Sequence, residues 1–168
     1  PSSLAPATSE RLRFSLIGGD TMLAMLDRPA TPQAGRPLVL LIHGVPGSED
    51  SPYMVRMSGT LLDKGYAVLR LNMRGAGPSR ATCGGQYSAG SSRDLAELIG
   101  LLPQDLTAAG VAAVGYSVGG AILLKYLGEE GARTKLRAAA SVSAPIDLFG
   151  TCSTLMRFRN LLYHRHVF

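Results

Sequence analysis

Apolar runs alternate along the chain with segments of helical periodicity. Residues 38–42 (LVLLI) are apolar at every position, which is typical of a parallel strand buried on both faces. Three further apolar runs, at 66–71, 111–114 and 136–142, indicate three more strands. The spacing of apolar residues predicts helices between them, over 53–64, 92–102 and 118–127, with Gly65 and Pro103 as stops and Ser92 as an N-terminal cap.

A hairpin is predicted before these elements. The runs 11–17 (RLRFSLI) and 21–26 (TMLAML) flank two glycines and an aspartate, which favour a tight turn. A hairpin followed by βαβαβαβ predicts an α/β fold with a mostly parallel sheet and helices on both faces. We therefore expect residues 1–168 to form one domain, with the hairpin at 11–27, the core at 38–142 and the start of a cap or linker at 145–168.

The turn VGYSVGG, at residues 114–120, carries the sharpest chemical signal. Ligands bind beyond the carboxyl ends of parallel strands, and a G-x-S-x-G turn between a strand and a helix exposes its serine there. Ser117 is therefore the candidate nucleophile, and the amide of Val118, at a helix N-terminus, is a candidate oxyanion donor. The alternative is a tight, well-packed turn with a structural serine.

The loop HGVPGS, at residues 43–48, follows the first parallel strand. Acyl transfer requires a second oxyanion donor, for which the amide of Val45 is the candidate. Gly44 and Gly47 allow the loop to pass close to the serine, although an ordinary turn would also use them. We expect His43 to orient its loop by hydrogen bonds and not to act as a base.

Arg74 and Asp94 are predicted to have structural roles. Arg74 ends a buried strand beside glycines, where it can pair with a carboxylate to fix the loop, the alternative being a contact with substrate. Asp94 lies at the start of a predicted helix, where the helix dipole stabilises a carboxylate.

Composition excludes several classes of function. The net charge of +5 comes from 17 Lys and Arg against 12 Asp and Glu. The basic residues are scattered, apart from Arg157, Arg159 and Arg165, and aromatic residues are few, so we expect no nucleic-acid partner. No run reaches the length of a membrane span, so we expect no stable membrane insertion. A P-loop, a complete dinucleotide fingerprint and a Cys/His metal spacing are all lacking, so we expect neither a cofactor nor a metal.

The two cysteines, Cys83 and Cys152, are far apart in the sequence. They are interpreted as free thiols with buried, structural positions in a reducing compartment, which favours a cytoplasmic location.

Longer stretches of the chain carry a family resemblance. The segments LLIHGVPGSEDSPYM, GYAVLRLNMRGAG, VGYSVGGAILLKYLGEEG, LRAAASVSAPIDL and RNLLYHRH resemble the YheT-like branch of the α/β-hydrolases, which is related to the ABHD lipid and ester hydrolases. The resemblance covers roughly residues 11–166. It implies an α/β-hydrolase fold whose C-terminal strands are missing, because only the N-terminal half of such an enzyme is matched. One departure is the sequence YSAG at 87–90, where the branch has Tyr-His-Ala-Gly, which puts any role for that histidine in doubt.

The acid and base that a serine hydrolase needs are expected downstream of Phe168, because in this family they follow later strands. We accordingly expect the chain as given to be inactive. A compact alternative would use Asp147 with His164 or His166, which follow Ser117 in the required order. The other interpretation is that Asp147 caps a helix and that the two histidines are solvated.

The sequence thus predicts a serine ester hydrolase that acts through an acyl-enzyme at Ser117 on a small-molecule acyl ester. A non-catalytic binding module and an acyltransferase remain as alternatives. We also expect self-association through the exposed sheet edge formed by residues 136–142.

Overall fold

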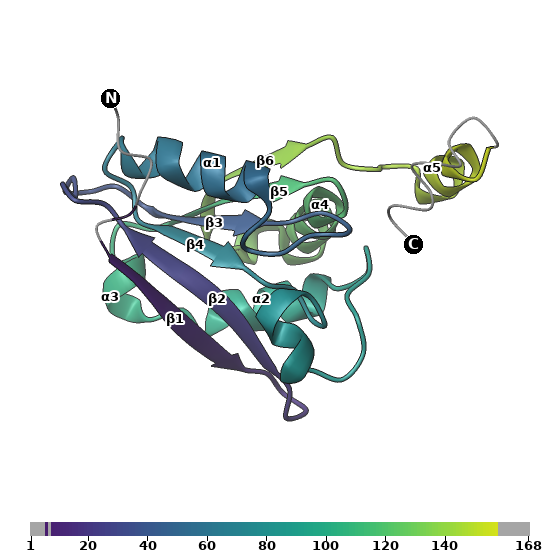
Figure 1. Cartoon of the computed structure of the whole chain (residues 1–168), viewed down its shortest axis with the longest axis horizontal. Coiled ribbons are helices and arrows are strands. Elements are labelled where there is room, and N and C mark those ends of the chain that lie inside the picture. Colours follow the sequence, from purple (N-terminus) through teal and green to yellow (C-terminus); the bar gives the residue numbers. More distant parts are fainter. Residues whose placement is uncertain (1–5, 7, 158–168) are drawn as a thin grey trace.

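A computed structural model describes residue 6 and residues 8–157 of the chain. The described strands form one six-stranded sheet in the order β1-β2-β4-β3-β5-β6. Figure 1 shows this sheet with helices packed on it. The strands are β1 (Thr8–Ser15), β2 (Thr21–Arg28), β3 (Leu38–Ile42), β4 (Val68–Leu71), β5 (Val111–Tyr116) and β6 (Leu136–Val142).

The predicted hairpin is present at one edge of the sheet. Strands β1 and β2 pair in antiparallel register from Thr8 with Arg28 to Ser15 with Thr21. The turn between them contains Gly18 and Gly19, both with positive φ angles. Strand β2 then pairs with β4, again antiparallel, so the hairpin extends the sheet.

The four remaining strands are parallel, as the sequence predicts. Strand β3 lies between β4 and β5, and β6 pairs with β5. Their arrowheads point the same way in Figure 1, so the loops that follow β3, β4, β5 and β6 gather at one edge of the sheet.

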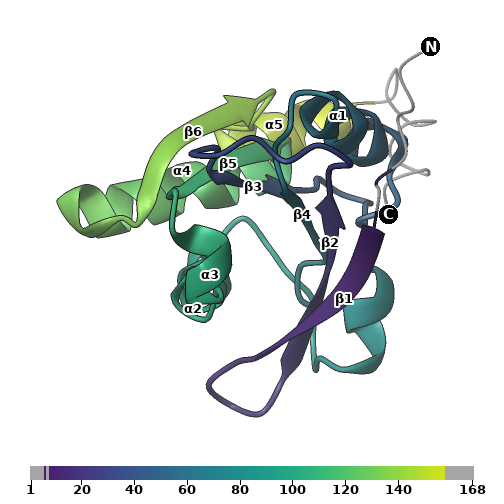
Figure 2. The same cartoon turned by 90° about the vertical axis from the view of Figure 1, so that its left-hand side faces the viewer.

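Helices cover both faces of the sheet. Helix α1 (Pro52–Leu62) lies on one side, and α2 (Ser92–Gly100), α3 (Gln104–Thr107) and α4 (Val118–Glu130) lie on the other (Figure 2). Helix α5 (Leu148–Leu155) lies beyond the end of β6 (Figure 1). Two short 3₁₀ helices, η1 (Gly77–Ala81) and η2 (Gly131–Arg133), complete the described elements.

Strand β3 is buried on both faces, which explains its continuous apolar run. Leu38, Leu40 and Ile42 belong to the larger core beneath α2 and α4. Val39 and Leu41 belong to the smaller core beneath α1. The alternation follows from the two-residue period of a strand, so every side chain of β3 needs to be apolar.

Three sequence expectations need correction. The N-cap of α2 is Ser91, without a side-chain capping bond, and Ser92 is the first helical residue. Strand β4 starts at Val68, two residues later than expected. Cys83 and Cys152 are free, but only Cys83 is partly buried and Cys152 is exposed, because α5, which carries Cys152, packs little against the sheet.

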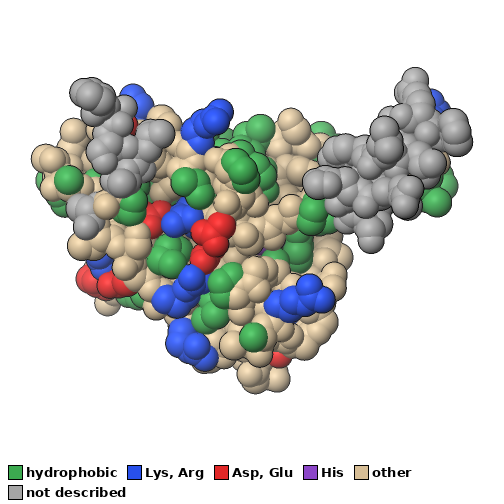
Figure 3. Space-filling view, viewed as in Figure 1, with side chains coloured by type: hydrophobic (Ala, Val, Ile, Leu, Met, Phe, Trp, Pro, Cys, Tyr) green, Lys and Arg blue, Asp and Glu red, His purple; other side chains and the backbone are tan. Residues whose placement is uncertain are grey.

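The surface of the protein carries both signs of charge. On the face seen in Figure 3, Lys and Arg side chains occur at several places, and some of them lie next to Asp or Glu. Among the helices of residues 8–157, none is both long enough and apolar enough to span a bilayer.

Strand β6 forms the second edge of the described sheet. It pairs with β5 on one side, and six of its seven residues are exposed. Unpaired N–H and C=O groups of an edge strand can pair with another chain.

We therefore predict that residues 1–168 self-associate through β6. Ala139→Lys should reduce the association, because a charged side chain opposes edge-to-edge pairing. Light scattering at increasing concentration measures this. A wild-type chain that remains monomeric at high concentration contradicts the prediction.

The start of α4 packs directly on the end of β3 at Gly119. A Cβ atom at Gly119 would lie 2.6 Å from the carbonyl oxygen of Ile42 and would also collide with that of His43. Gly128, near the other end of the same helix, has open space around it.

We predict that Gly119→Ala lowers the free energy of unfolding by about 2 kcal/mol, because a backbone contact cannot move aside as a flexible side chain can. The matched variant Gly128→Ala should raise it by about 0.5–1 kcal/mol through helix propensity. Urea unfolding of both variants measures the difference, and equal effects would refute the packing argument.

Candidate active site

Ser117 occupies the turn between β5 and α4. Its φ and ψ angles are 51° and −123°, a region that residues other than glycine rarely adopt. Its N–H donates to the carbonyl of Val142 at 2.8 Å, which ties the turn to the end of β6. Helix α4 starts at the next residue, Val118. The structure therefore has the strained strand–turn–helix geometry that the sequence predicts.

The loop after β3 lies against this turn. A Cβ atom at Gly44 would be 2.8 Å from Cβ of Ser117 and 3.1 Å from the carbonyl oxygen of Tyr116. Only glycine permits this approach. Two segments that are far apart in the sequence, 44–47 and 115–119, are thus brought together.

Ser117, Val118 and Val45 line one cavity of about 650 Å³. A smaller cavity of about 250 Å³ also contains Val45 and Ser117. Within residues 8–157, no hydrogen bond uses the N–H of Val45 or of Val118. The three candidate residues are therefore close in space and share a surface. The remaining lining of the larger cavity is mostly apolar and comes from 88–89, 143–145 and α5.

His43 is fully buried beside this site. Its Nδ1 lies 2.8 Å from the carbonyl oxygen of Gly44, and its Nε2 accepts a hydrogen bond from the N–H of Met73 at 3.1 Å. These contacts assign the proton to Nδ1, because a carbonyl can only accept and an amide N–H can only donate. Burial lowers the pKa of His43 below its usual value. The contacts of both ring nitrogens hold the loop, as the sequence predicts, and they leave the ring neutral.

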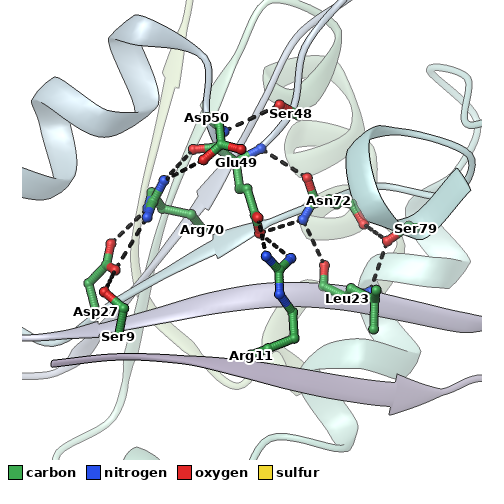
Figure 4. A network of polar contacts seen from close by, with 10 residues as sticks. All are labelled: Ser9, Arg11, Leu23, Asp27, Ser48, Glu49, Asp50, Arg70, Asn72 and Ser79. Carbon is green, nitrogen blue, oxygen red and sulfur yellow. Dashed lines mark hydrogen bonds and ion pairs between the residues drawn. The ribbon is translucent and has the colours of Figure 1, made fainter.

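A buried polar network holds the loop after β3 in place (Figure 4). The carboxylate of Glu49 receives hydrogen bonds from Arg11 at 2.8 Å and from Asn72 at 2.6 Å. Arg70 donates to the carbonyl of Glu49 at 2.6 Å and to the carboxylate of Asp27 at 2.7 Å. The network joins β1, β2 and β4 to the loop that carries Val45.

Sequence reasoning did not find this network. The available signal was the sequence VLRLN at 68–72, in which Arg70 and Asn72 interrupt an apolar strand at alternate positions. Both therefore point to one face, where charged groups need partners. Their partners, Asp27 and Glu49, lie 43 and 23 residues earlier, and local patterns do not identify them.

Arg74 fixes the loop after β4, as expected. Its guanidinium donates to the two carboxylate oxygens of Asp94 at 2.9 and 2.8 Å and also pairs with Asp20. The hydrogen bond with Asp94 is the main reason that the pKa of Arg74 is raised. Asp94 lies in the first turn of α2, as predicted, and it also has Arg74 as a partner across the loop.

Of the alternative acid and base within the chain, Asp147 with His164 or His166, the structure describes only Asp147. The side chain of Asp147 caps α5 by accepting a hydrogen bond from the N–H of Gly150 at 2.9 Å, which confirms the capping interpretation. His164 and His166 lie outside the described residues. His43 is the one histidine that the structure describes, and its two ring nitrogens are already occupied.

The lowered pKa of His43 makes the free energy of unfolding depend on pH. Between the lowered pKa of the folded chain and the usual pKa of 6.5, the unfolded chain binds a proton at this ring and the folded chain does not. The contribution of His43 to the free energy of unfolding should therefore be complete above pH 6.5 and decrease as the pH falls towards the lowered pKa.

A variant with His164→Gln and His166→Gln leaves His43 as the single imidazole of the three in the chain. Long-range ¹H–¹⁵N NMR of this variant should show the proton of the neutral ring on Nδ1 and a pKa of the ring below 6.5. A pKa of the ring at or above 6.5 would contradict the assignment.

Relatives of the chain are found among esterases and lipases. It is 30% identical over 156 residues to the putative esterase YheT of Escherichia coli, covering 92% of this chain and 46% of that protein. It is 32% identical over 127 residues to bovine phospholipase ABHD3, covering 76% and 31%. It is also 34% identical over 113 residues to the yeast medium-chain fatty acid ethyl ester synthase/esterase 2, covering 67% and 25%. The chain thus spans less than half the length of these relatives.

A similar fold occurs among solved structures. An esterase of Pyrococcus furiosus superposes with a TM-score of 0.73 at 18% identity, over 94% of this chain and 61% of that one. The family model described as "alpha/beta hydrolase fold" matches residues 37–165. These similarities agree with the resemblance to the YheT-like branch. The chain therefore belongs to the α/β-hydrolase fold family.

Proposed function

We propose that the protein is a serine hydrolase that cleaves carboxylic esters of small molecules through an acyl-enzyme at Ser117. The observation that supports this most directly is the arrangement of Ser117 with two free backbone donors. Val45 and Val118 line the cavity of Ser117, and neither amide has a partner in the described chain. Such donors can stabilise an oxyanion that forms beside the serine.

In the proposed reaction, Oγ of Ser117 attacks the ester carbonyl carbon while a base accepts its proton. The carbonyl oxygen becomes the tetrahedral oxyanion and binds the N–H groups of Val45 and Val118. Collapse of the intermediate breaks the C–O bond, and the alcohol leaves with the proton from the base. Water then attacks the acyl-enzyme by the same route and releases the carboxylic acid.

The base in this scheme must be a histidine other than His43, because the nitrogens of His43 contact Gly44 and Met73. We assign it to a residue outside 8–157, with an acid to orient it. The alternative within the chain uses Asp147 as the acid and His164 or His166 as the base.

The substrate class follows from the relatives and from the cavity. The names of the relatives describe esterases, a phospholipase and an ester synthase. The larger cavity is lined mainly by apolar side chains, including Val118, Leu148 and Leu155, which suit an acyl chain. An acyl ester is therefore the proposed substrate.

A second candidate is acyl transfer to an alcohol. The name of the yeast relative includes ester synthesis as well as hydrolysis. The same acyl-enzyme would serve, with an alcohol in place of water as the attacking group. Adding ethanol to the assay and measuring ethyl ester against free acid distinguishes the two.

For the complete gene product, we predict hydrolysis of p-nitrophenyl acyl esters and covalent labelling by a fluorophosphonate. Ser117→Ala should abolish both, because the attacking atom is lost. The matched variant Ser15→Ala, at an exposed position on β1, should retain both. Turnover that survives Ser117→Ala would refute the proposal, and absence of turnover and labelling would favour a binding module.

For residues 1–168 alone, we expect little turnover. Turnover that Ser117→Ala abolishes in these 168 residues would instead support Asp147 with His164 or His166 as the acid and base.

A further inference from the structure

The carbonyl oxygen of Gly44 accepts two hydrogen bonds from side chains. His43 donates from Nδ1 at 2.8 Å, and Tyr87 donates from its hydroxyl, also at 2.8 Å. The two rings meet edge to face with centroids 5.1 Å apart. Tyr87 belongs to the loop before α2, so it reaches Gly44 from 43 residues away.

The N–H of Gly44 is held as well. It donates to the hydroxyl of Tyr53 at 3.0 Å, and the Tyr53 ring packs on that of Tyr116 with centroids 4.9 Å apart. Tyr116 precedes Ser117 directly. Tyr53 therefore joins the loop after β3 to the turn that carries the serine.

Together these contacts fix both peptide groups on either side of Gly44. The peptide between Gly44 and Val45 is trans and planar, so its C=O and N–H point in opposite directions. When His43 and Tyr87 hold the C=O, the N–H of Val45 must point away from them. Val45 also lines the two cavities that contain Ser117.

We propose that Tyr87 is a positioning residue, which, together with Tyr53, aims the Val45 N–H at the oxyanion formed on Ser117. The assignment rests on the proposed function of this site. It adds two tyrosines that act through the backbone of Gly44, to which their hydroxyls are hydrogen-bonded. A donor aimed before the reaction starts stabilises the transition state without a cost of reorganisation.

Tyr87 is itself well anchored. Its N–H donates to the carbonyl of Arg74 at 2.9 Å, and Arg74 is held by Asp94 and Asp20. Burial raises the pKa of Tyr87 far above its usual value, so the hydroxyl stays a proton donor over the whole working range of pH. The structural pairing of Arg74 thus also supports the site.

A single NMR experiment can test the hydrogen bond without activity. Within residues 1–168, a Gly–Val pair occurs only at Gly44–Val45 and at Gly110–Val111. A sample with ¹³C-carbonyl glycine and ¹⁵N valine should therefore give two cross-peaks in an HNCO spectrum. The Gly110 carbonyl is bound by the N–H of Leu38 in the sheet and serves as the internal reference. The variant Val111→Ile assigns the peaks by removing one of them.

Tyr87→Phe should shift the Gly44–Val45 peak and leave the Gly110–Val111 peak in place. Tyr66→Phe is the matched control, because it removes a tyrosine hydroxyl that binds Arg36 on the surface, and it should move neither peak. A Gly44–Val45 peak that stays in place in Tyr87→Phe overturns the proposal, whatever the activity.

The kinetic test uses the complete gene product. Tyr87→Phe should lower kcat about 10-fold with KM unchanged, less than the 10²- to 10³-fold typical of losing an oxyanion donor, because His43 still holds the carbonyl. An unchanged kcat, or a rise in KM alone, overturns the positioning role. If the wild type shows no turnover that depends on Ser117, the proposed function fails, and the NMR shift alone then decides whether Tyr87 holds Gly44.

Discussion

The close contact between the start of α4 and the end of β3 is the constraint on which the site depends. Gly119 lies so near the carbonyls of Ile42 and His43 that a single Cβ atom would push them apart. This contact places the first turn of α4 beside the loop after β3. The amides of Val118 and Val45 consequently share one cavity with Ser117. If α4 lay farther from β3, the amides of Val118 and Val45 would no longer face the same cavity.

Buried charges keep the loop from moving away from this contact. Glu49 and Asp27 are almost completely buried, and removing carboxylates from water is costly unless they are paired and hydrogen-bonded. Here Arg11, Arg70 and Asn72 provide those partners. Displacing the loop would break several of these bonds at once. The network therefore fixes one position of the loop, whether or not it adds to the total stability of the fold.

The two sides of the site are held by different means. On the side of the serine, glycines and a strained backbone bring the turn close to β3. On the side of Val45, side chains from three separate segments hold the Gly44 peptide groups, namely His43, Tyr53 and Tyr87. A backbone N–H has no rotatable side chain of its own, so hydrogen bonds from surrounding side chains to the neighbouring peptide group set its orientation. Hydrogen bonds from neutral groups suit this task, because burial lowers the pKa of His43 and raises that of Tyr87, so both groups stay neutral between those pKa values.

The sequence by itself determined the order of strands and helices, the parallel core and the positions of Ser117, Val118 and Val45. These features depend on periodicity and turn residues, which act over a few neighbouring positions. Only the tertiary structure decided that Arg70 pairs with Asp27, that Asn72 pairs with Glu49 and that Tyr87 reaches Gly44. These partners come from separate elements, and packing of the sheet and its loops brings them together. No local pattern carries that information, because a contact across more than 20 residues depends on the path of the whole chain between them.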